Sequence, residues 1–143
     1  MNRGAYLDQY RRNSVDSASP LQLVIMLYDG ALRFIEQARV AIKQKNLAAQ
    51  NDSLQKAQRI IAELTSSLDM DRGGEIATNL FSLYNFCYSE LVTANIMDDE
   101  SKLDAVIVVL VGLRDGWVQL DAQQKSNSVA ANFGNPSETR LAS

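Results

Sequence analysis

The sequence predicts an all-α fold, an antiparallel up-down-up-down four-helix bundle with a short N-terminal helical segment and a disordered C-terminal tail. Four long segments carry apolar residues at alternating spacings of three and four, and short polar breaks separate them. Short connections between helices of similar length favour antiparallel neighbours. The 143 residues suffice for one domain with its own core. We expect this domain at residues 1–123 and the tail at 124–143.

The first helix is predicted from about Pro20 to Gln44. Ser19 can cap free backbone N–H groups, and proline suits the first helical position. From Leu21 to Ile42 the apolar residues cover about 200° of the helix, whereas one buried face needs about 100°. Gly30 costs about 1 kcal/mol relative to alanine in mid-helix, which indicates close helix packing. This helix has more apolar surface than one side of a core requires.

The second helix begins near Leu47, and it has the narrowest apolar arc, about 120°. An arc of this width is typical of a helix that covers one side of a core. Its inward positions follow a strict alternation of three and four: Leu54, Ala57, Ile61, Leu64 and Leu68.

The third helix follows a break at residues 69–74 and takes Glu75 into its first turn, where a carboxylate suits the helix dipole. Its predicted inner seam is Ile76, Leu80, Leu83, Cys87, Leu91 and Ala94. The fourth helix follows a break at residues 97–100, and Ser101 with Asp104 resembles a capping box. Its predicted seam is Leu103, Val106, Leu110, Leu113, Trp117 and Leu120. The run at residues 106–111 is β-prone, but its flanks continue the helical period.

The two ends of the chain differ from the middle. Tyr6, Leu7 and Tyr10 lie on a segment that can form one or two helical turns. After Ala122 the chain is rich in Gln, Ser, Asn and Ala, a composition that cannot bury enough apolar surface to order itself. The tail is therefore predicted to be disordered.

The composition gives no support to catalysis, and we expect neither a cofactor nor a metal. The chain has no histidine, the commonest general base. Cys87 falls on an inner seam, where a buried thiol is inert. Residues 69–80 imitate a calcium loop but have Gly73 and Leu80 at two ligand positions. Apart from these, Asp98, Asp99 and Glu100 fit a solvated helix junction better than a catalytic cluster.

Charge and hydropathy also limit the partners and the compartment. A net charge of −3 without a basic run argues against nucleic acid. No signal peptide opens the chain, and its longest strongly apolar run, residues 105–113, is too short to span a bilayer. A single cysteine fits a reducing compartment. These features predict a cytoplasmic protein that does not insert into membranes.

Surplus apolar surface on three helices points to recognition. Residues beside the seams widen the apolar arcs of the third and fourth helices: Phe81, Tyr84, Phe86, Tyr88, Ile107, Val108 and Val111. Such surface marks a binding groove or an oligomer interface. An amphipathic helix could lie in the groove, or a second copy of the chain could cover it. Alternatively, a bundle with splayed helices would tolerate wide apolar arcs without any partner. If a groove exists, the two N-terminal tyrosines could cover it while it is empty.

Several segments of the chain form motifs that are weak one by one but specific in their order and spacing. They are Tyr6, Tyr10, residues 18–20, 26–34, 55–61, Leu64, 68–69, 73–84, Leu91, 94–95, Leu110, 113–114 and Trp117. Together they resemble the FliS-type flagellar export chaperones, over roughly residues 4–120.

The resemblance implies a non-enzymatic helical bundle that binds the C-terminal region of newly made flagellin in the bacterial cytosol. That region is disordered when free and becomes helical on the chaperone. Binding prevents early polymerisation and delivers flagellin to the flagellar type III export gate. A self-associating helical scaffold is the alternative. A regulatory second partner stays open, as does the choice between a monomer and a weak homodimer.

The same resemblance suggests residues for the groove. Tyr6 and Tyr10 match the segment that caps the groove in this family. The third-helix motif contributes Asn79, Leu80, Leu83 and Tyr84, and Asn79 could bond the ligand backbone. On surplus apolar surface alone we add Ile25, Tyr28 and Ile107.

Overall fold

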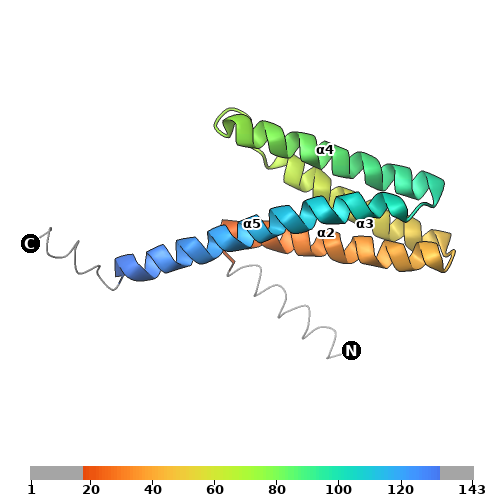
Figure 1. Cartoon of the computed structure of the whole chain (residues 1–143), viewed down its shortest axis with the longest axis horizontal. Coiled ribbons are helices and arrows are strands. Elements are labelled where there is room, and N and C mark those ends of the chain that lie inside the picture. The colour runs from red at the N-terminus through yellow and green to blue at the C-terminus, as the bar shows by residue number, and fades with distance from the viewer. Residues whose placement is uncertain (1–17, 133–143) are drawn as a thin grey trace, which may run out of the picture.

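The computed structural model describes the backbone of residues 18–132 and the side chains of residues 18–127. Tyr6 and Tyr10 lie outside this range. The described part contains helices and no strand. Its four helices are α2 (Pro20–Lys43), α3 (Leu47–Ser66), α4 (Gly74–Met97) and α5 (Ser101–Asn132). They form a ring in which α2 and α4 are diagonal, and each packs against both α3 and α5 (Figure 1). The predicted all-α bundle is confirmed.

The start of α2 forms as its sequence predicts. The Ser19 hydroxyl accepts a hydrogen bond from the Gln22 backbone N–H at 3.1 Å, and the Gln22 side chain accepts one from the Ser19 N–H at 3.1 Å. Pro20 occupies the first turn, where its missing N–H costs nothing. This capping box fixes the point at which the chain enters the bundle.

The connection between α3 and α4 depends on two glycines. A Cβ at Gly73 would lie 2.5 Å from the Cβ of Ala77, which is too close for any side chain. Gly74 has a φ of +55°, a conformation that favours glycine. The tight turn between these helices therefore requires both residues.

The turn before α5 differs from the predicted capping box. Asp98 adopts the left-handed conformation that ends α4. Asp99, not Asp104, then accepts hydrogen bonds from the hydroxyl of Ser101 at 2.6 Å and from its N–H at 2.9 Å. These bonds lower the pKa of the Asp99 carboxyl. Asp104 instead accepts a hydrogen bond from Arg39 of α2 at 2.8 Å, so the capping-box prediction was wrong.

The core lies along the ring's centre, and most predicted seam residues reach it. The buried members include Ile35, Leu54, Ile61, Leu91, Leu103, Val106 and Leu110. Two predictions were wrong. Ile76 is 70% exposed because it lies in the first turns of α4, at one end of the bundle. Leu120 is 38% exposed because it lies far along α5, near the end of the bundle.

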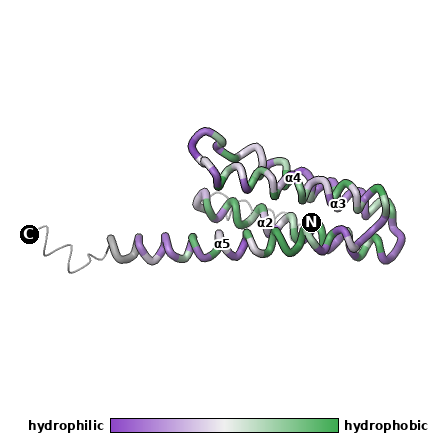
Figure 2. Tube along the Cα trace, turned by 45° about the horizontal axis from the view of Figure 1, so that its top comes forward, coloured by the Kyte–Doolittle hydropathy of each residue, from purple (hydrophilic) through white to green (hydrophobic). Residues whose placement is uncertain are grey.

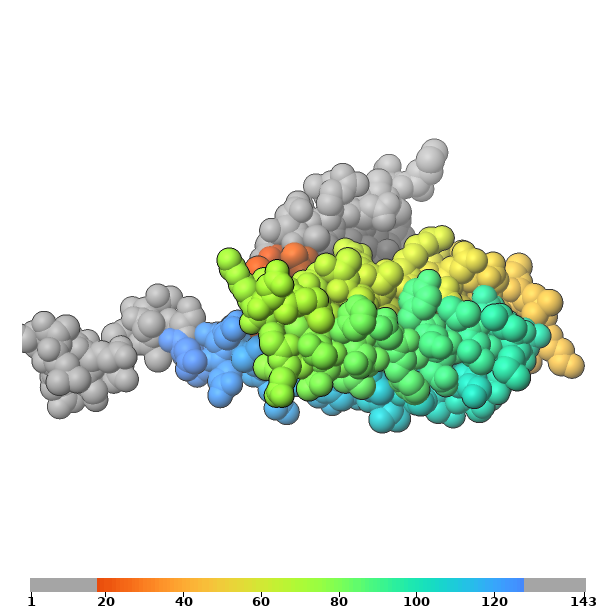
Figure 3. All heavy atoms as spheres, turned by 90° about the horizontal axis from the view of Figure 1, so that it is seen from above, coloured from red at the N-terminus to blue at the C-terminus, as the bar shows by residue number. Residues whose placement is uncertain are grey.

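The last part of α5 extends beyond its neighbours. Figure 3 shows residues in blue continuing past the green end of α4. Composition predicted a disordered tail from residue 124, whereas the helix runs to Asn132. Alanine, glutamine and lysine are good helix formers, so local propensity can continue a helix whose side chains at residues 122–127 are all exposed. Residues 133–143 lie outside the described range. None of the described helices is apolar enough over a sufficient length to cross a membrane.

Candidate partner-binding groove

The bundle leaves many large apolar side chains uncovered. The exposed ones include five that the sequence placed beside the seams: Phe81, Phe86, Tyr88, Val108 and Val111. Figure 2 shows hydrophobic segments on each of the four helices, with hydrophilic residues prominent in the turns. The prediction of surplus apolar surface is therefore confirmed for α4 and α5.

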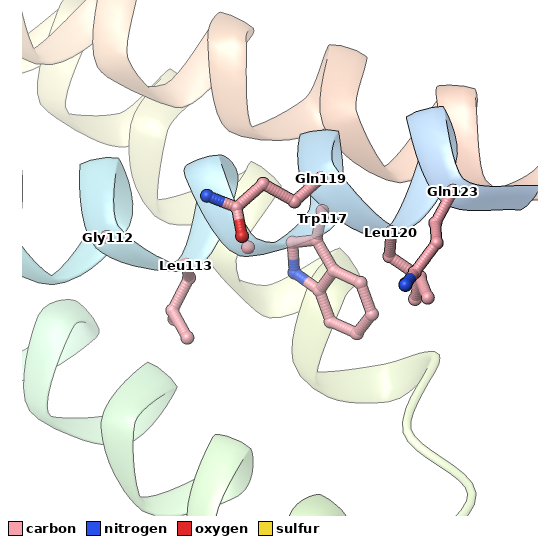
Figure 4. Close-up of a pocket in the computed structure, with 7 residues that line it drawn as sticks. Gly112, Leu113, Trp117, Gln119, Leu120 and Gln123 are labelled. Atoms are coloured by element: carbon pink, nitrogen blue, oxygen red, sulfur yellow. The ribbon is translucent and has the colours of Figure 1, made fainter. Parts of the chain in front are cut away.

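A pocket also lies along α5, and none of these five exposed side chains lines it. It has a volume of about 430 Å³, and every residue that lines it belongs to this helix: Gly112, Leu113, Gly116, Trp117, Gln119, Leu120 and Gln123. Leu113 and Trp117 point from α5 toward the side where α4 passes (Figure 4). We call this hollow the α5 pocket. Its apolar walls and open mouth suit an apolar side chain from another molecule.

Gly112 and Gly116 form part of the wall. A Cβ built at either position meets no atom of the described residues within 4 Å. By contrast, a Cβ at Gly30 would lie 3.2 Å from Ile60 of α3. Glycine inside a helix costs about 1 kcal/mol relative to alanine. Close packing explains Gly30 as predicted, but no contact within the described chain explains the two glycines of the α5 pocket.

Polar contacts tie α5 to α2. Arg39 contacts Asp104 at 2.8 Å, and Lys43 lies 3.9 Å from Glu100. Arg114 pairs with Asp29 of α2. Their carboxylate partners raise the pKa of both arginines.

The seam between α4 and α5 has a different character. Between the described residues of α4 and α5 there is neither a hydrogen bond nor an ion pair. The seam between α3 and α4, in contrast, holds Gln50, which donates to Asp98 at 2.8 Å. The α4–α5 seam thus depends on apolar packing, and the α5 pocket lies beside it.

A buried polar cluster lies inside the bundle. The hydroxyls of Tyr28 and Tyr84 are 2.5 Å apart, and the two side chains are almost fully buried. Burial raises the pKa of both hydroxyls. The indole N–H of Trp117 lies near Tyr28 and lowers the pKa of its hydroxyl, although no described residue accepts a hydrogen bond of good geometry from this buried nitrogen. Burial also raises the pKa of the Cys87 thiol to about 12, so the thiol stays protonated.

The structure separates the predicted groove residues into two groups. Asn79 is exposed, and Ile25, Leu83 and Ile107 are half-buried. The other three, Tyr28, Leu80 and Tyr84, lie in the core, so direct contact with a partner would require the helices to separate. Ile25 lines another hollow of about 330 Å³ between α2 and α5. The groove role of all these residues stays a prediction.

Sequence reasoning missed the two glycines of the α5 pocket. The signal that could have found them is a pair of glycines four residues apart inside an otherwise regular helical pattern. Among the residues that the structure describes, no group of three or more potential ligands could hold a metal ion.

Comparisons with known proteins place this bundle in a family. The sequence profile described as flagellar protein FliS matches residues 1–124. A flagellar secretion chaperone FliS of Vibrio cholerae is 37% identical over 132 residues, which cover 90% of this chain and 96% of that protein. Its counterpart in Bacillus subtilis is 39% identical over 110 residues, covering 77% and 81%.

A further relative and a solved structure agree. The flagellar secretion chaperone FliS of Salmonella typhimurium is 38% identical over 117 residues, covering 81% of this chain and 87% of that protein. A crystal structure of a flagellar chaperone from bacteria aligns with a TM-score of 0.69 and 22% identity, over 86% of this chain and 99% of the other, and supports the fold. The chain therefore belongs to the FliS family, whose relatives are flagellar secretion chaperones and not enzymes.

Proposed function

We propose that this chain is a cytosolic export chaperone for flagellin. It binds the disordered C-terminal region of flagellin, prevents premature polymerisation, and delivers the bound subunit to the flagellar type III export apparatus. The observation that carries the proposal is apolar surface that the bundle does not cover, on the exposed side chains of α4 and α5 and in the α5 pocket. Family membership supports the flagellar role.

The chemistry of the groove fits a chain that folds as it binds. Apolar walls supply the driving force for burying one face of an amphipathic helix. Ordering a flexible segment costs free energy, which lowers the net affinity. A chaperone must release its cargo, so a moderate affinity suits this role.

The predicted residues take different parts in this proposal. Asn79, Leu83, Ile25 and Ile107 contact the bound chain. The buried residues Tyr28, Leu80 and Tyr84 hold the helices that form the groove. Tyr6 and Tyr10 cover the groove until cargo arrives.

Calorimetry with a flagellin C-terminal fragment tests the proposal, with circular dichroism to follow induced helix. We expect a one-to-one complex with more helix than the separate components. Leu120→Glu places a charge in the α5 pocket and should weaken binding at least tenfold, which is about 1.4 kcal/mol. Ala105→Glu is the matched control, because Ala105 is exposed on the same helix and belongs neither to the pocket nor to the large apolar side chains named above. Absence of binding by the unmodified chain would refute the proposal.

Sedimentation separates this function from that of a self-associating scaffold. The chaperone should form a complex with one flagellin fragment, whether the free chain is a monomer or a weak dimer. A scaffold would stay a dimer with or without the fragment, and its Leu120→Glu variant would become a monomer.

Deletion of residues 1–15 tests the covering role of Tyr6 and Tyr10. If these residues compete with cargo for the groove, their removal should raise the association rate. An unchanged rate, together with unchanged binding of a hydrophobic dye, would count against that role.

A further inference from the structure

We infer that the outer face of α4 is a surface on which two copies of this chain pair, helix against antiparallel helix, about a two-fold axis at Asn85. Five exposed residues form this surface, which we call the α4 face: Phe81, Ser82, Asn85, Tyr88 and Ser89. In Figure 3 α4 is drawn in green on the side toward the viewer, and no other described helix lies over it. The inference concerns self-association, so it does not depend on the proposed cargo.

The first step is the absence of exposed charge along α4. Every exposed residue from Ile76 to Met97 is uncharged, and the only charged residue of this stretch, Glu90, is half-buried. Each of the other three helices exposes charged side chains, such as Arg33 of α2 and Lys56 of α3. The outward side of a bundle helix normally carries charged and polar residues. Surface that is depleted of charge and enriched in aromatic rings is typical of the centre of a protein interface.

The second step is the aromatic surface and its border. Phe81 and Tyr88 are 41% and 42% exposed, although burial of a large apolar side chain is worth about 1.5–3 kcal/mol. Beyond Tyr88, toward the end of α4, Asn95 donates a hydrogen bond to the Asn51 side chain of α3 at 2.9 Å. Gln55 donates to the same oxygen at 3.2 Å. An uncharged amide network therefore borders the α4 face, as the polar rim borders an interface.

The third step identifies the occupant from the order of large and small side chains. Tyr88 and Ser82 lie three residues from Asn85 in opposite directions, and Ser89 and Phe81 lie four residues from it. A two-fold axis at Asn85 brings together positions at equal and opposite distances along two antiparallel copies of α4. Tyr88 then faces Ser82 of the second copy, and Phe81 faces its Ser89. Each large ring meets a small side chain, so the α4 face is complementary to itself.

Asn85 has the chemistry that the axis position requires. An amide side chain both donates and accepts hydrogen bonds, so two copies of Asn85 can bond to each other. A single asparagine in a helix interface is known to fix the alignment of the helices. A charged residue at the axis would instead repel its own copy. Because the whole chain carries a net charge of −3, an uncharged face suits the approach of two copies.

This pairing leaves the candidate groove accessible. At about 100° per residue, Asn79 and Leu83 lie about 120° and 160° around α4 from Asn85. The α5 pocket belongs to another helix. One pair of helices buries less than the about 800 Å² per copy of a standard interface. We therefore expect a dimer that dissociates on dilution and does not compete with cargo.

Charges at the axis test the inference. Asn85→Asp and Asn85→Lys each place like charges opposite one another, so each should weaken self-association at least tenfold in sedimentation over a concentration series. An equal mixture of the two variants should restore association, because residue 85 of one copy meets residue 85 of the other at this axis. Asn127→Asp makes the same change at an exposed position of α5 and should leave self-association unchanged. Circular dichroism checks that every variant is folded.

The outcomes separate this inference from the proposed function. A monomeric unmodified chain over the whole series would overturn the inference and leave flagellin binding intact. A dimer that persists in both charge variants, or a mixture that does not associate, would also overturn it.

The Asn85→Asp variant should bind the flagellin C-terminal fragment with unchanged affinity. If this variant loses the fragment while the unmodified chain is monomeric, the α4 face belongs to cargo and the inference is wrong. Failure of the unmodified chain to bind the fragment would contradict the proposed function alone.

Discussion

On the side that faces α2, charged groups hold α5 through the pairs Arg39–Asp104 and Arg114–Asp29, whereas on the side that faces α4 the described residues offer only apolar packing. Ion pairs at a surface add little stability, but they favour one alignment of two helices. An apolar seam tolerates sliding and separation more readily, because no directional bond has to break. The α5 pocket lies on the side without polar contacts between the helices (Figure 4).

The largest expected effect comes from trimming the apolar packing of α5. Leu110 is fully buried in the core, so Leu110→Ala should lower the free energy of unfolding by about 3 kcal/mol. Urea denaturation followed by circular dichroism measures the change. Val108→Ala, at an exposed site on the same helix, should cost less than about 0.5 kcal/mol. Similar losses for both variants would mean that packing does not dominate this helix.

The next largest effect tests the hydrogen bond that joins Tyr28 of α2 to Tyr84 of α4 across the bundle. Tyr84→Phe leaves the buried Tyr28 hydroxyl without its partner and should cost about 1–2 kcal/mol. The double variant with Tyr28→Phe should cost less than the sum of the single changes, because it removes both hydroxyls. Denaturation of all four proteins gives the coupling, and simple additivity would argue against the hydrogen bond.

A third effect appears only at alkaline pH. The pKa of the Cys87 thiol is raised by burial from 9.0 to about 12, so the unfolded chain releases this proton first. Stability is therefore complete below pH 9 and falls as the pH rises toward 12, by up to about 1.4 kcal/mol per pH unit. The two buried tyrosines add a loss of the same sign above pH 10.

Replacement of the thiol isolates its share. Unfolding measured from pH 8 to 10 should show a shallower slope for Cys87→Ala than for the unmodified chain. Parallel slopes would mean that the thiol ionises equally in both states.

The smallest effect concerns the ion pairs that face α2. Arg114→Gln should cost no more than about 1 kcal/mol, because both partners are partly exposed. The cost should shrink in about 1 M salt, where surface charges are screened. Lys125→Gln, which breaks a pair within α5 alone, is the control and should cost less. A large loss that salt does not change would reverse the comparison between the two sides of α5.

The sequence was sufficient to predict the helices and most of the core. Ser19 and Pro20 marked the start of α2 through local chemistry, and alternating spacings identified residues such as Leu54 and Leu110. Hydrophobic periodicity does not show where a neighbouring helix ends. Ile76 and Leu120 were therefore predicted to lie on the inner seams, but both side chains are exposed. Helix length beyond Ala122 depended on local propensity rather than on burial.

The groove was less accessible to prediction. A wide apolar arc indicates surplus surface, but not the side on which a hollow forms. Tyr28 and Tyr84 belong to the apolar arcs of α2 and α4, but their hydroxyls form a hydrogen bond with each other in the core. Gly112 and Gly116 carry no apolar side chain, so a search for apolar residues passes over them.

The hydroxyl pair of Tyr28 and Tyr84 has a consequence for the uniqueness of the fold. The pair joins two diagonal helices, and the two tyrosines are 56 residues apart in the chain. If α4 slid by one turn along its neighbours, the two hydroxyls would separate, and the slipped arrangement would lose this buried hydrogen bond. The hydrogen bond between these two oxygen atoms thus favours one alignment of α2 and α4, whereas apolar packing alone is compatible with several alignments.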